Sequence, residues 1–299
     1  MFVHGIGGLR DAVTERRDWL RALAEGARGA GHAHAVSGLT QGWLAEVRFA
    51  DYSDLFLPDQ GQGAGSGDLD DQVAFLDALV RDLIDELGAQ AVERGDQRTL
   101  RAIEHARAQL PEASGQAQGF AQPVRLLARI LTTVLQVPGL RRAAQWSSGQ
   151  PLLGHLAQVS RYLNRAEADQ EGTGLDARIR ARLLHGTDPG RPLVVVAHSL
   201  GTVVAFEALH SYLGRVDLFV TLGSPLATGA AVLQRVRPRP ARTPESVERW
   251  LNFWDRDDIV VTRPRLRPYY QGDGQRRRTP LAAAAVSCGR TKSSARLSC

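Results

Sequence analysis

The most informative stretch of this sequence reads Pro192-Leu193-Val194-Val195-Val196-Ala197-His198-Ser199-Leu200-Gly201. Its apolar, β-branched half is typical of a central strand in a parallel sheet that is covered on both faces. The mostly apolar residues from Leu200 to Tyr212 predict that a helix follows directly. A serine on a tight turn between a strand and a helix, flanked by the small residues Ala197 and Gly201, is the pattern of a nucleophile elbow. Ser199 is therefore the candidate nucleophile; the alternative is an ordinary strand-to-helix junction with a buried serine.

Strand and helix patterns alternate along the rest of the chain. Short apolar or alternating runs predict strands at the start of the chain and at residues 45–50, 217–222 and 250–254. Residues 14–30 have the apolar spacing of a helix. This alternation predicts an α/β fold with a mostly parallel, doubly wound sheet.

The same reading divides the chain into a core, an insertion and a tail. The 299 residues are enough for one large core, which we expect in residues 1–68 and 183–270. Residues 69–182 have a helical pattern without strand signals and predict a large helical cap inserted between two strands. Residues 271–299 are expected to be a disordered or aberrant tail, because from Gly274 onward they have no acidic residue, no aromatic residue and no strand or helix period.

Two further segments carry candidate site residues. His4-Gly5-Ile6-Gly7 ends the first strand, where a glycine-rich turn can supply backbone amides to an oxyanion hole. We assign these amides to Ile6, with Gly5 as its neighbour, and to Leu200 after the nucleophile; the alternative is a plain glycine turn.

The late strand at residues 250–254 is followed by several carboxylates. A carboxylate at this place is needed to orient a catalytic histidine. Asp258 is the candidate, with Asp257 and Asp255 as alternatives, and a solvated acidic loop is the competing interpretation.

Together these segments resemble bacterial α/β-hydrolases related to lipases and inositol-deacylase-like esterases. The resemblance covers residues 1–60 and 175–262 and rests on residues 2–7, 197–201, 221–226 and 250–260. It implies an α/β-hydrolase fold with a helical cap, and a serine hydrolase that cleaves carboxylic esters through an acyl-enzyme on Ser199. This chain departs from the family in two ways: Ala197 stands where a glycine is usual, and no histidine follows Asp258, the last being His210.

A complete catalytic triad is therefore not expected. We assign His4 to the oxyanion turn and His198 to packing, with its side chain directed away from Ser199. His210 is three helical turns beyond Ser199, about 16 Å along the axis, which is too far to share a proton. We hypothesise that a change of reading frame between Tyr270 and Arg278 replaced the final strand, loop and histidine.

The substrate class follows from the cap. A predicted helix at residues 124–135 is apolar on most of its surface, which suits a lipid-like acyl ester or a peripheral contact with a membrane, although such a helix more often simply forms the core of the cap. Amide and thioester substrates stay open, and no cofactor or metal is expected, since no residue cluster has ligand spacing. The second hypothesis is a catalytically impaired α/β-hydrolase-fold protein that binds an acyl ligand or a partner.

Composition points away from other classes of function. The net charge of +5 comes from six basic residues after Asp273, so the body is close to neutral and no nucleic-acid partner is expected. The two cysteines, both in the tail, do not form a disulfide framework. The sequence has neither a secretion leader nor a long apolar run, so the expected location is cytoplasmic. This expectation leaves open a natural N-terminus upstream of Met1.

Overall fold

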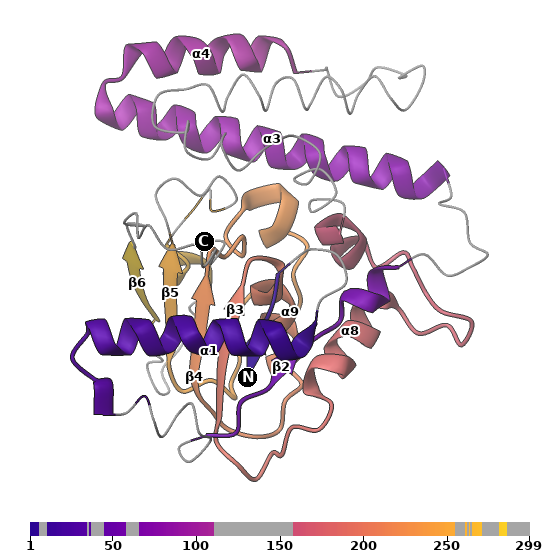
Figure 1. Cartoon of the computed structure of the whole chain (residues 1–299). Helices are drawn as coiled ribbons and strands as arrows, with labels where there is room; N and C mark the ends of the chain where they lie inside the picture. Colours follow the sequence, from indigo (N-terminus) through magenta and orange to yellow (C-terminus); the bar gives the residue numbers. More distant parts are fainter. Residues whose placement is uncertain are drawn as a thin grey trace.

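A computed structural model describes residues 1–5, 11–34, 36, 45–57, 66–110, 158–254, 261, 263, 265–270 and 281–285. Within them, six strands form one sheet in the order β2-β1-β3-β4-β5-β6, and all neighbouring pairs are parallel (Figure 1). The strands are β1 (Phe2–Val3), β2 (Phe49–Ala50), β3 (Leu193–His198), β4 (Val216–Leu222), β5 (Trp250–Trp254) and β6 (Leu281–Ala285). The predicted parallel α/β sheet is confirmed, although β2 is shorter than the predicted strand at residues 45–50.

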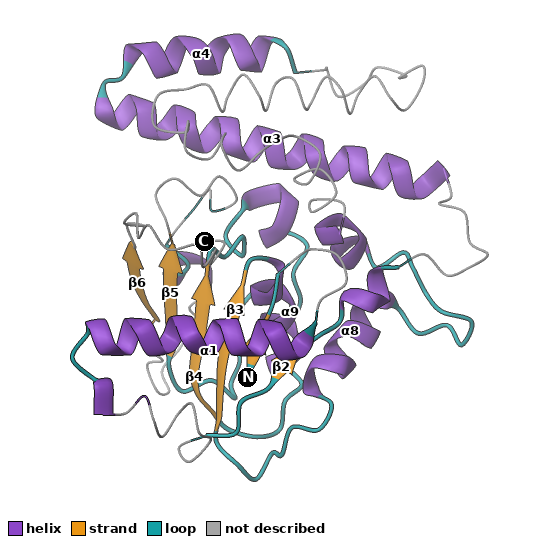
Figure 2. Ribbon diagram, viewed as in Figure 1, coloured by secondary structure: helices purple, strands orange, loops and turns teal. Residues whose placement is uncertain are grey.

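Helices lie on both faces of this sheet (Figure 2). Neighbouring residues of a strand point to opposite faces. On β1, Phe2 contacts Trp19 of α1 (Ala12–Gly29), with ring centroids 5.0 Å apart, whereas Val3 is fully buried in the core shared with α9 (Leu200–Leu209). Helix α8 (Leu175–Leu184) packs beside α9. Among the helices described, none is both long and apolar enough to cross a bilayer.

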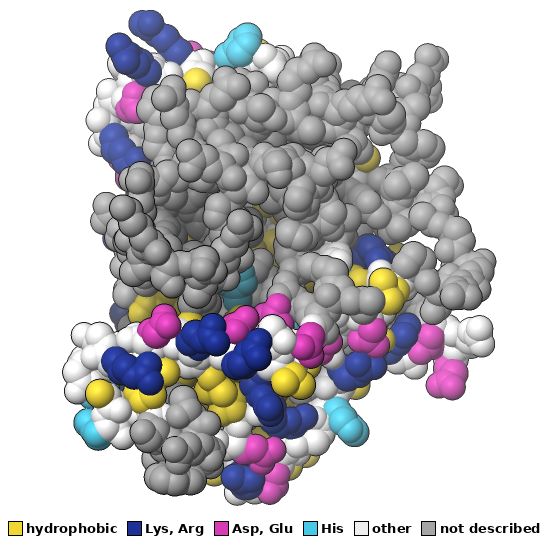
Figure 3. Space-filling model, viewed as in Figure 1, with side chains coloured by type: hydrophobic (Ala, Val, Ile, Leu, Met, Phe, Trp, Pro, Cys, Tyr) yellow, Lys and Arg dark blue, Asp and Glu magenta, His cyan; other side chains and the backbone are white. Residues whose placement is uncertain are grey.

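Helix α1 forms the outer layer on its side of the sheet. Its first turn is capped by the Asp11 carboxylate, which accepts a hydrogen bond from the Val13 amide (3.2 Å). Acidic and basic side chains are interspersed on its outer surface (Figure 3), and the Asp18 carboxylate lies 3.7 Å from Arg17 and 3.9 Å from Arg21. The helix thus follows the predicted range of residues 14–30 closely and presents its polar side outward.

The core lies between the sheet and α9. Val195 and Ala197 of β3 are fully buried, and the buried ring of Trp250 lies 6.0 Å from that of Phe206 in α9. Val194, which points to the opposite face of β3, is 44% exposed. Val194 lies on the α1 face near the start of β3, so the face that α1 covers is less completely buried at that end of the strand.

Two cap helices, α3 (Ser66–Arg94) and α4 (Gln97–Ala108), lie above the carboxyl ends of the strands (Figure 1). The Asp82 carboxylate of α3 accepts a hydrogen bond (3.0 Å) from the Ala231 amide of η2 (Gly229–Leu233), a helical turn that follows β4. Glu86 of α3 pairs with Arg263 at 3.5 Å. These contacts join the cap to the edge of the sheet that carries the candidate site.

Helix α8 departs from the predicted domain boundary. Its residues 175–182 fall within the predicted cap, yet Leu175, Ile179 and Leu183 form a buried stripe and the helix packs against α9. Helical periodicity is the same in a cap helix and in a helix beside a sheet, so the pattern did not separate the two. The predicted acyl-contacting helix at residues 124–135 lies outside the described residues.

Strand β6 corrects the expectation for the tail. Residues 281–285 pair with β5 along its whole length, although no strand was expected after residue 270. A leucine followed by four alanines gives neither an alternating pattern nor β-branched residues. Pairing through the backbone needs neither, so residues 281–285 form a strand within the predicted tail, and the change of reading frame stays a hypothesis.

Two short helices complete the described elements. Helix η1 (Ser53–Phe56) follows β2, and α10 (Arg267–Tyr270) precedes β6 in the chain. Tyr270 is fully buried and its hydroxyl donates to the Leu226 carbonyl (2.6 Å). This bond connects the segment after β5 to the loop that follows β4.

Candidate active site

Ser199 lies on the turn between β3 and α9 in a strained backbone conformation. Its φ of 51° and ψ of −126° are rare for a residue with a side chain and cost about 1–3 kcal/mol. Three hydrogen bonds keep the turn in place: the Ser199 amide donates to the Leu222 carbonyl (3.0 Å), and the Ser199 carbonyl accepts from the amide and hydroxyl of Thr202 (2.9 and 2.7 Å). The predicted strand, turn and helix are therefore present, and the strain is concentrated at the candidate nucleophile.

Two glycines allow β1 to pass directly against this turn. A Cβ atom at Gly201 would lie 2.2 Å from the His4 carbonyl oxygen and 2.7 Å from that of Val3. A Cβ atom at Gly5 would lie 2.8 Å from the Ser199 Cβ. The sequence motifs around Gly5 and Ser199, almost two hundred residues apart, thus meet at the carboxyl edge of the sheet.

The backbone amide of Leu200 is suitably placed for an oxyanion. Leu200 is the first residue of α9, and the first amides of a helix have no partner within the helix and lie at its positive end. Ile6, the other predicted amide donor, lies outside the described residues, and so do Asp255, Asp257 and Asp258. The strand that precedes these three aspartates in the sequence is present: it is β5, which ends at Trp254.

Two buried hydroxyl groups support the turn and were not predicted. The hydroxyl of Thr202, which bonds the Ser199 carbonyl, lies 2.8 Å from the hydroxyl of Ser224. The Ser224 hydroxyl also accepts a hydrogen bond from the Leu226 amide (3.3 Å). The sequence contains a signal for both residues. Thr202 comes one helical turn after Ser199, and Ser224 lies in one of the motifs that carry the family resemblance.

Two histidines lie near Ser199. His4 is buried, and its ring nitrogens face the Gly5 carbonyl and Asp51 rather than the serine. The ring of His198 lies against Gly5, with Nδ1 3.4 Å from the position of an added Cβ. The assignment of His4 to the turn agrees with this geometry, and the ring of His198 lies beside the same turn.

His210 is at the far end of α9, where it caps the helix. Its ring meets the Phe206 ring edge-on, with centroids 4.9 Å apart. Burial, and secondarily the nearby charge of Arg242, lowers the pKa of His210 to about 4. His210 is therefore neutral at pH 7 and one helix length away from Ser199.

This lowered pKa makes stability depend on pH. The unfolded chain binds the proton at the ordinary histidine pKa of about 6.5, whereas folded His210 resists it until about pH 4. The free energy of unfolding should therefore fall as the pH drops from 6.5 to 4. Urea unfolding across this range should show a smaller fall for His210→Gln than for the wild type; parallel curves would contradict the assignment.

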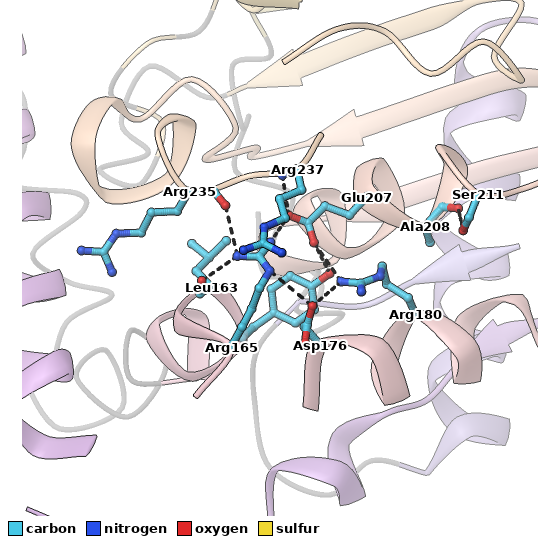
Figure 4. A network of polar contacts seen from close by, with 10 residues as sticks. Leu163, Arg165, Asp176, Arg180, Glu207, Ala208, Ser211, Arg235 and Arg237 are labelled. Atoms are coloured by element: carbon cyan, nitrogen blue, oxygen red, sulfur yellow. Dashed lines mark hydrogen bonds and ion pairs between the residues drawn. The ribbon is translucent and has the colours of Figure 1, made fainter. Parts of the chain in front are cut away.

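A buried ionic network fixes the helix that carries the elbow (Figure 4). The Glu207 side chain of α9 is only 2% exposed. Its oxygens accept hydrogen bonds from the Tyr162 hydroxyl (2.9 Å), the guanidinium groups of Arg165 and Arg180 (2.5 and 3.1 Å) and the Arg237 amide (2.8 Å). Burial and the Glu207 carboxylate raise the pKa of Tyr162 well above its ordinary value, so this hydroxyl keeps its proton and donates.

Asp176 of α8 completes the network, because it pairs with Arg165 (3.3 Å) and Arg180 (2.7 Å). Two carboxylates and two guanidinium groups thereby connect α9, α8 and residues 162–165. The network was not predicted. Glu207 is the one charged residue among the apolar residues of α9, which is the sequence signal that it is paired.

Within the described part of the chain, no group of three or more His, Cys, Asp or Glu side chains is arranged to hold a metal ion. Comparisons with family models, curated proteins and solved structures gave no match to this chain.

Proposed function

We propose that this chain is a serine hydrolase of the α/β-hydrolase fold that acts on carboxylic esters, with Ser199 as its nucleophile. The observation that carries the proposal is the strained φ of 51° at Ser199, on a strand-to-helix turn against which Gly5 packs. Such a turn exposes a serine hydroxyl at the carboxyl edge of a sheet, which an ordinary strand-to-helix junction does not require.

The order of the candidate groups along the sheet supports the proposed fold. The oxyanion turn follows β1, Ser199 follows the neighbouring β3, and the segment with Asp258 follows β5. Carboxyl ends of parallel strands lie at one edge of the sheet, where α/β proteins bind their ligands. The further strand β6 comes after the acidic segment, as it does in the family that the sequence resembles.

The proposed chemistry begins with attack of the Ser199 hydroxyl oxygen on the ester carbonyl carbon. The negative charge that develops on the carbonyl oxygen is stabilised by the Leu200 amide at the positive end of α9 and by the turn after Gly5, with Ile6 as donor. The bond from the carbonyl carbon to the alkoxy oxygen breaks, and the alkoxide takes up, through solvent, the proton released from Ser199 and leaves as the alcohol. Water then cleaves the ester on Ser199, which gives the carboxylic acid and restores the serine hydroxyl. The proposal of a lipid-like acyl chain rests on the apolar sequence of residues 124–135, which lie outside the described residues.

One observation favours a second function. The last histidine is His210, so the position after Asp258 that should supply the general base has no histidine. Loss of one triad member leaves mainly oxyanion stabilisation and binding. The second candidate is therefore an impaired α/β-hydrolase-fold protein that binds an acyl ligand or a partner.

Hydrolysis of nitrophenyl esters with short, medium and long acyl chains separates the two candidates. The wild type should release nitrophenolate slowly and accumulate an acyl adduct detectable by intact-protein mass. Ser199→Ala should lower the rate by about 100-fold or more, because the covalent route is lost. The exposed Ser211 provides a control, and Ser211→Ala should match the wild type. Equal rates for the wild type and Ser199→Ala would reject the hydrolase and favour the binding protein.

A further inference from the structure

Two buried hydroxyl groups form a directed chain of hydrogen bonds that ends on the carbonyl of Ser199. The Thr202 hydroxyl donates to this carbonyl (2.7 Å) and therefore has no second proton to donate. Its oxygen lies 2.8 Å from the Ser224 hydroxyl, so Ser224 must be the donor in that bond. The Ser224 oxygen in turn accepts from the Leu226 amide (3.3 Å). Each proton in the chain thus points toward the turn that carries the candidate nucleophile.

This hydroxyl chain is closed off from water and joins two elements. Thr202 and Leu226 are completely buried, and Ser224 is 1% exposed. A threonine in a helix often returns its hydroxyl to a carbonyl three or four residues earlier, and that bond alone indicates only local structure. Here the hydroxyl has a second buried partner from the loop after β4, and removing either hydroxyl leaves a buried group without its bond. The chain therefore ties the first turn of α9 to that loop.

The carbonyl at the end of the chain belongs to the strained residue. The ψ of −126° at Ser199 sets the plane of the peptide group that joins Ser199 to Leu200. A rare backbone conformation persists only where its surroundings hold it. The Ser199 carbonyl accepts from both the amide (2.9 Å) and the hydroxyl of Thr202, so this plane cannot turn without breaking both bonds. The hydroxyl chain therefore opposes relaxation of the strained turn.

The plane of this peptide group also sets the direction of the candidate oxyanion donor. In a trans peptide, the carbonyl oxygen and the following amide hydrogen point in opposite directions, and the bond between Ser199 and Leu200 is trans. The Ser199 carbonyl is directed at Thr202 inside α9, so the Leu200 amide is directed away from the body of the helix. At this first position of a helix an amide has no acceptor within the helix.

We propose that Thr202 and Ser224 are positioning residues that hold the Leu200 amide in the direction required for oxyanion binding. This inference rests on the proposed function, in which that amide stabilises the negative charge on the ester carbonyl oxygen. A donor that already points at the developing charge stabilises it more than a donor that must turn into place during the reaction. Both hydroxyls act through the peptide group after Ser199.

The test measures how fast a fluorophosphonate ester modifies Ser199 and separates the limiting rate of phosphonylation from the reversible binding constant. A fixed oxyanion donor stabilises the transition state more than the initial complex. Thr202→Val keeps the shape of the side chain and loses the hydroxyl, so the limiting rate should fall by about 10-fold, with little change in the binding constant. Thr202→Ser keeps the hydroxyl and should stay within about 2-fold of the wild-type limiting rate.

Thr221→Val is the matched control. Thr221 is also completely buried, but its hydroxyl donates to the Asn252 side chain (2.8 Å) and accepts from the Trp250 indole (3.0 Å), both in β5. This variant should lose stability, because it leaves buried partners without their bonds, and should keep the wild-type limiting rate. Equal limiting rates in Thr202→Val and Thr221→Val, with both chains folded by circular dichroism, would overturn the inference.

Ser224→Ala tests the far end of the chain and keeps the inference testable if Thr202→Val does not fold. It should lower the limiting rate by about 5-fold, the worth of one hydrogen bond. Because Ser224 acts only through Thr202, the same substitution should have no further effect in the Thr202→Val background. A wild-type limiting rate in Ser224→Ala, or the same loss in both backgrounds, would overturn the inference alone. No modification of Ser199 in a folded wild-type chain would overturn the proposed function and this inference with it.

Discussion

Replacing Glu207 with glutamine is expected to lower the free energy of unfolding by about 3 kcal/mol. The substitution keeps the size of the side chain and removes one of the two carboxylates that balance Arg165 and Arg180. Glu207 and Arg165 are both nearly inaccessible to solvent, so water cannot replace the lost charge. A buried arginine that loses one of its two carboxylate partners is strongly destabilising. The intact network, in contrast, contributes little net stability compared with an apolar core of the same size.

The matched control is Glu46→Gln. Glu46 pairs with Arg191 at 3.3 Å, but both side chains are about two-thirds exposed, at 67% and 64%. An exposed pair is worth less than about 1 kcal/mol. Urea unfolding should therefore separate the two variants clearly. Similar urea midpoints for Glu207→Gln and Glu46→Gln would mean that Glu207 is not paired in a buried network.

Gly201→Ala is expected to destroy the elbow. The added methyl group would lie 2.2 Å from the His4 carbonyl oxygen, and that backbone is held by the β1–β3 pairing and by Tyr52. Because backbone cannot move aside as a side chain does, we expect a loss of about 3 kcal/mol of stability together with loss of Ser199 reactivity.

Gly26→Ala serves as the control for Gly201→Ala. Gly26 is inside α1, and an added Cβ there meets no atom within 4 Å. Alanine in a helix interior is better than glycine by about 1 kcal/mol, so this variant should be slightly more stable than the wild type. If Gly201→Ala were as stable as Gly26→Ala, β1 would not pass against the turn as described.

Much of the sheet could be predicted because its signals are local. The β-branched run before Ser199 and the small residues around it specify a strand, a sharp turn and a helix within ten residues, and the structure has all three. Strands β4 and β5 were equally clear from their apolar runs. Strand β6 was missed because Leu281 and the four alanines after it have no strand pattern and pair only through the backbone.

The sequence does not show which residues lie next to one another in space. Helix α8 has the same periodicity as the cap helices, and only its contact with α9 shows which layer it joins. His4 was assigned to the oxyanion turn, but its pairing with Asp51 depends on the parallel alignment of β1 and β2, which the sequence does not specify. Glu207 was recognisable as an isolated charge in an apolar helix, but its partners come from three separate segments.

Covalent modification by a fluorophosphonate ester, followed by intact-protein mass and peptide mapping, tests the role of Ser199 most directly. We expect one added group per chain, on the peptide that contains Ser199, in the wild type and in Ser211→Ala, and no added group in Ser199→Ala. Labelling that persists at another residue in Ser199→Ala, or no labelling of a folded wild-type chain, would contradict the assignment of Ser199 as the nucleophile.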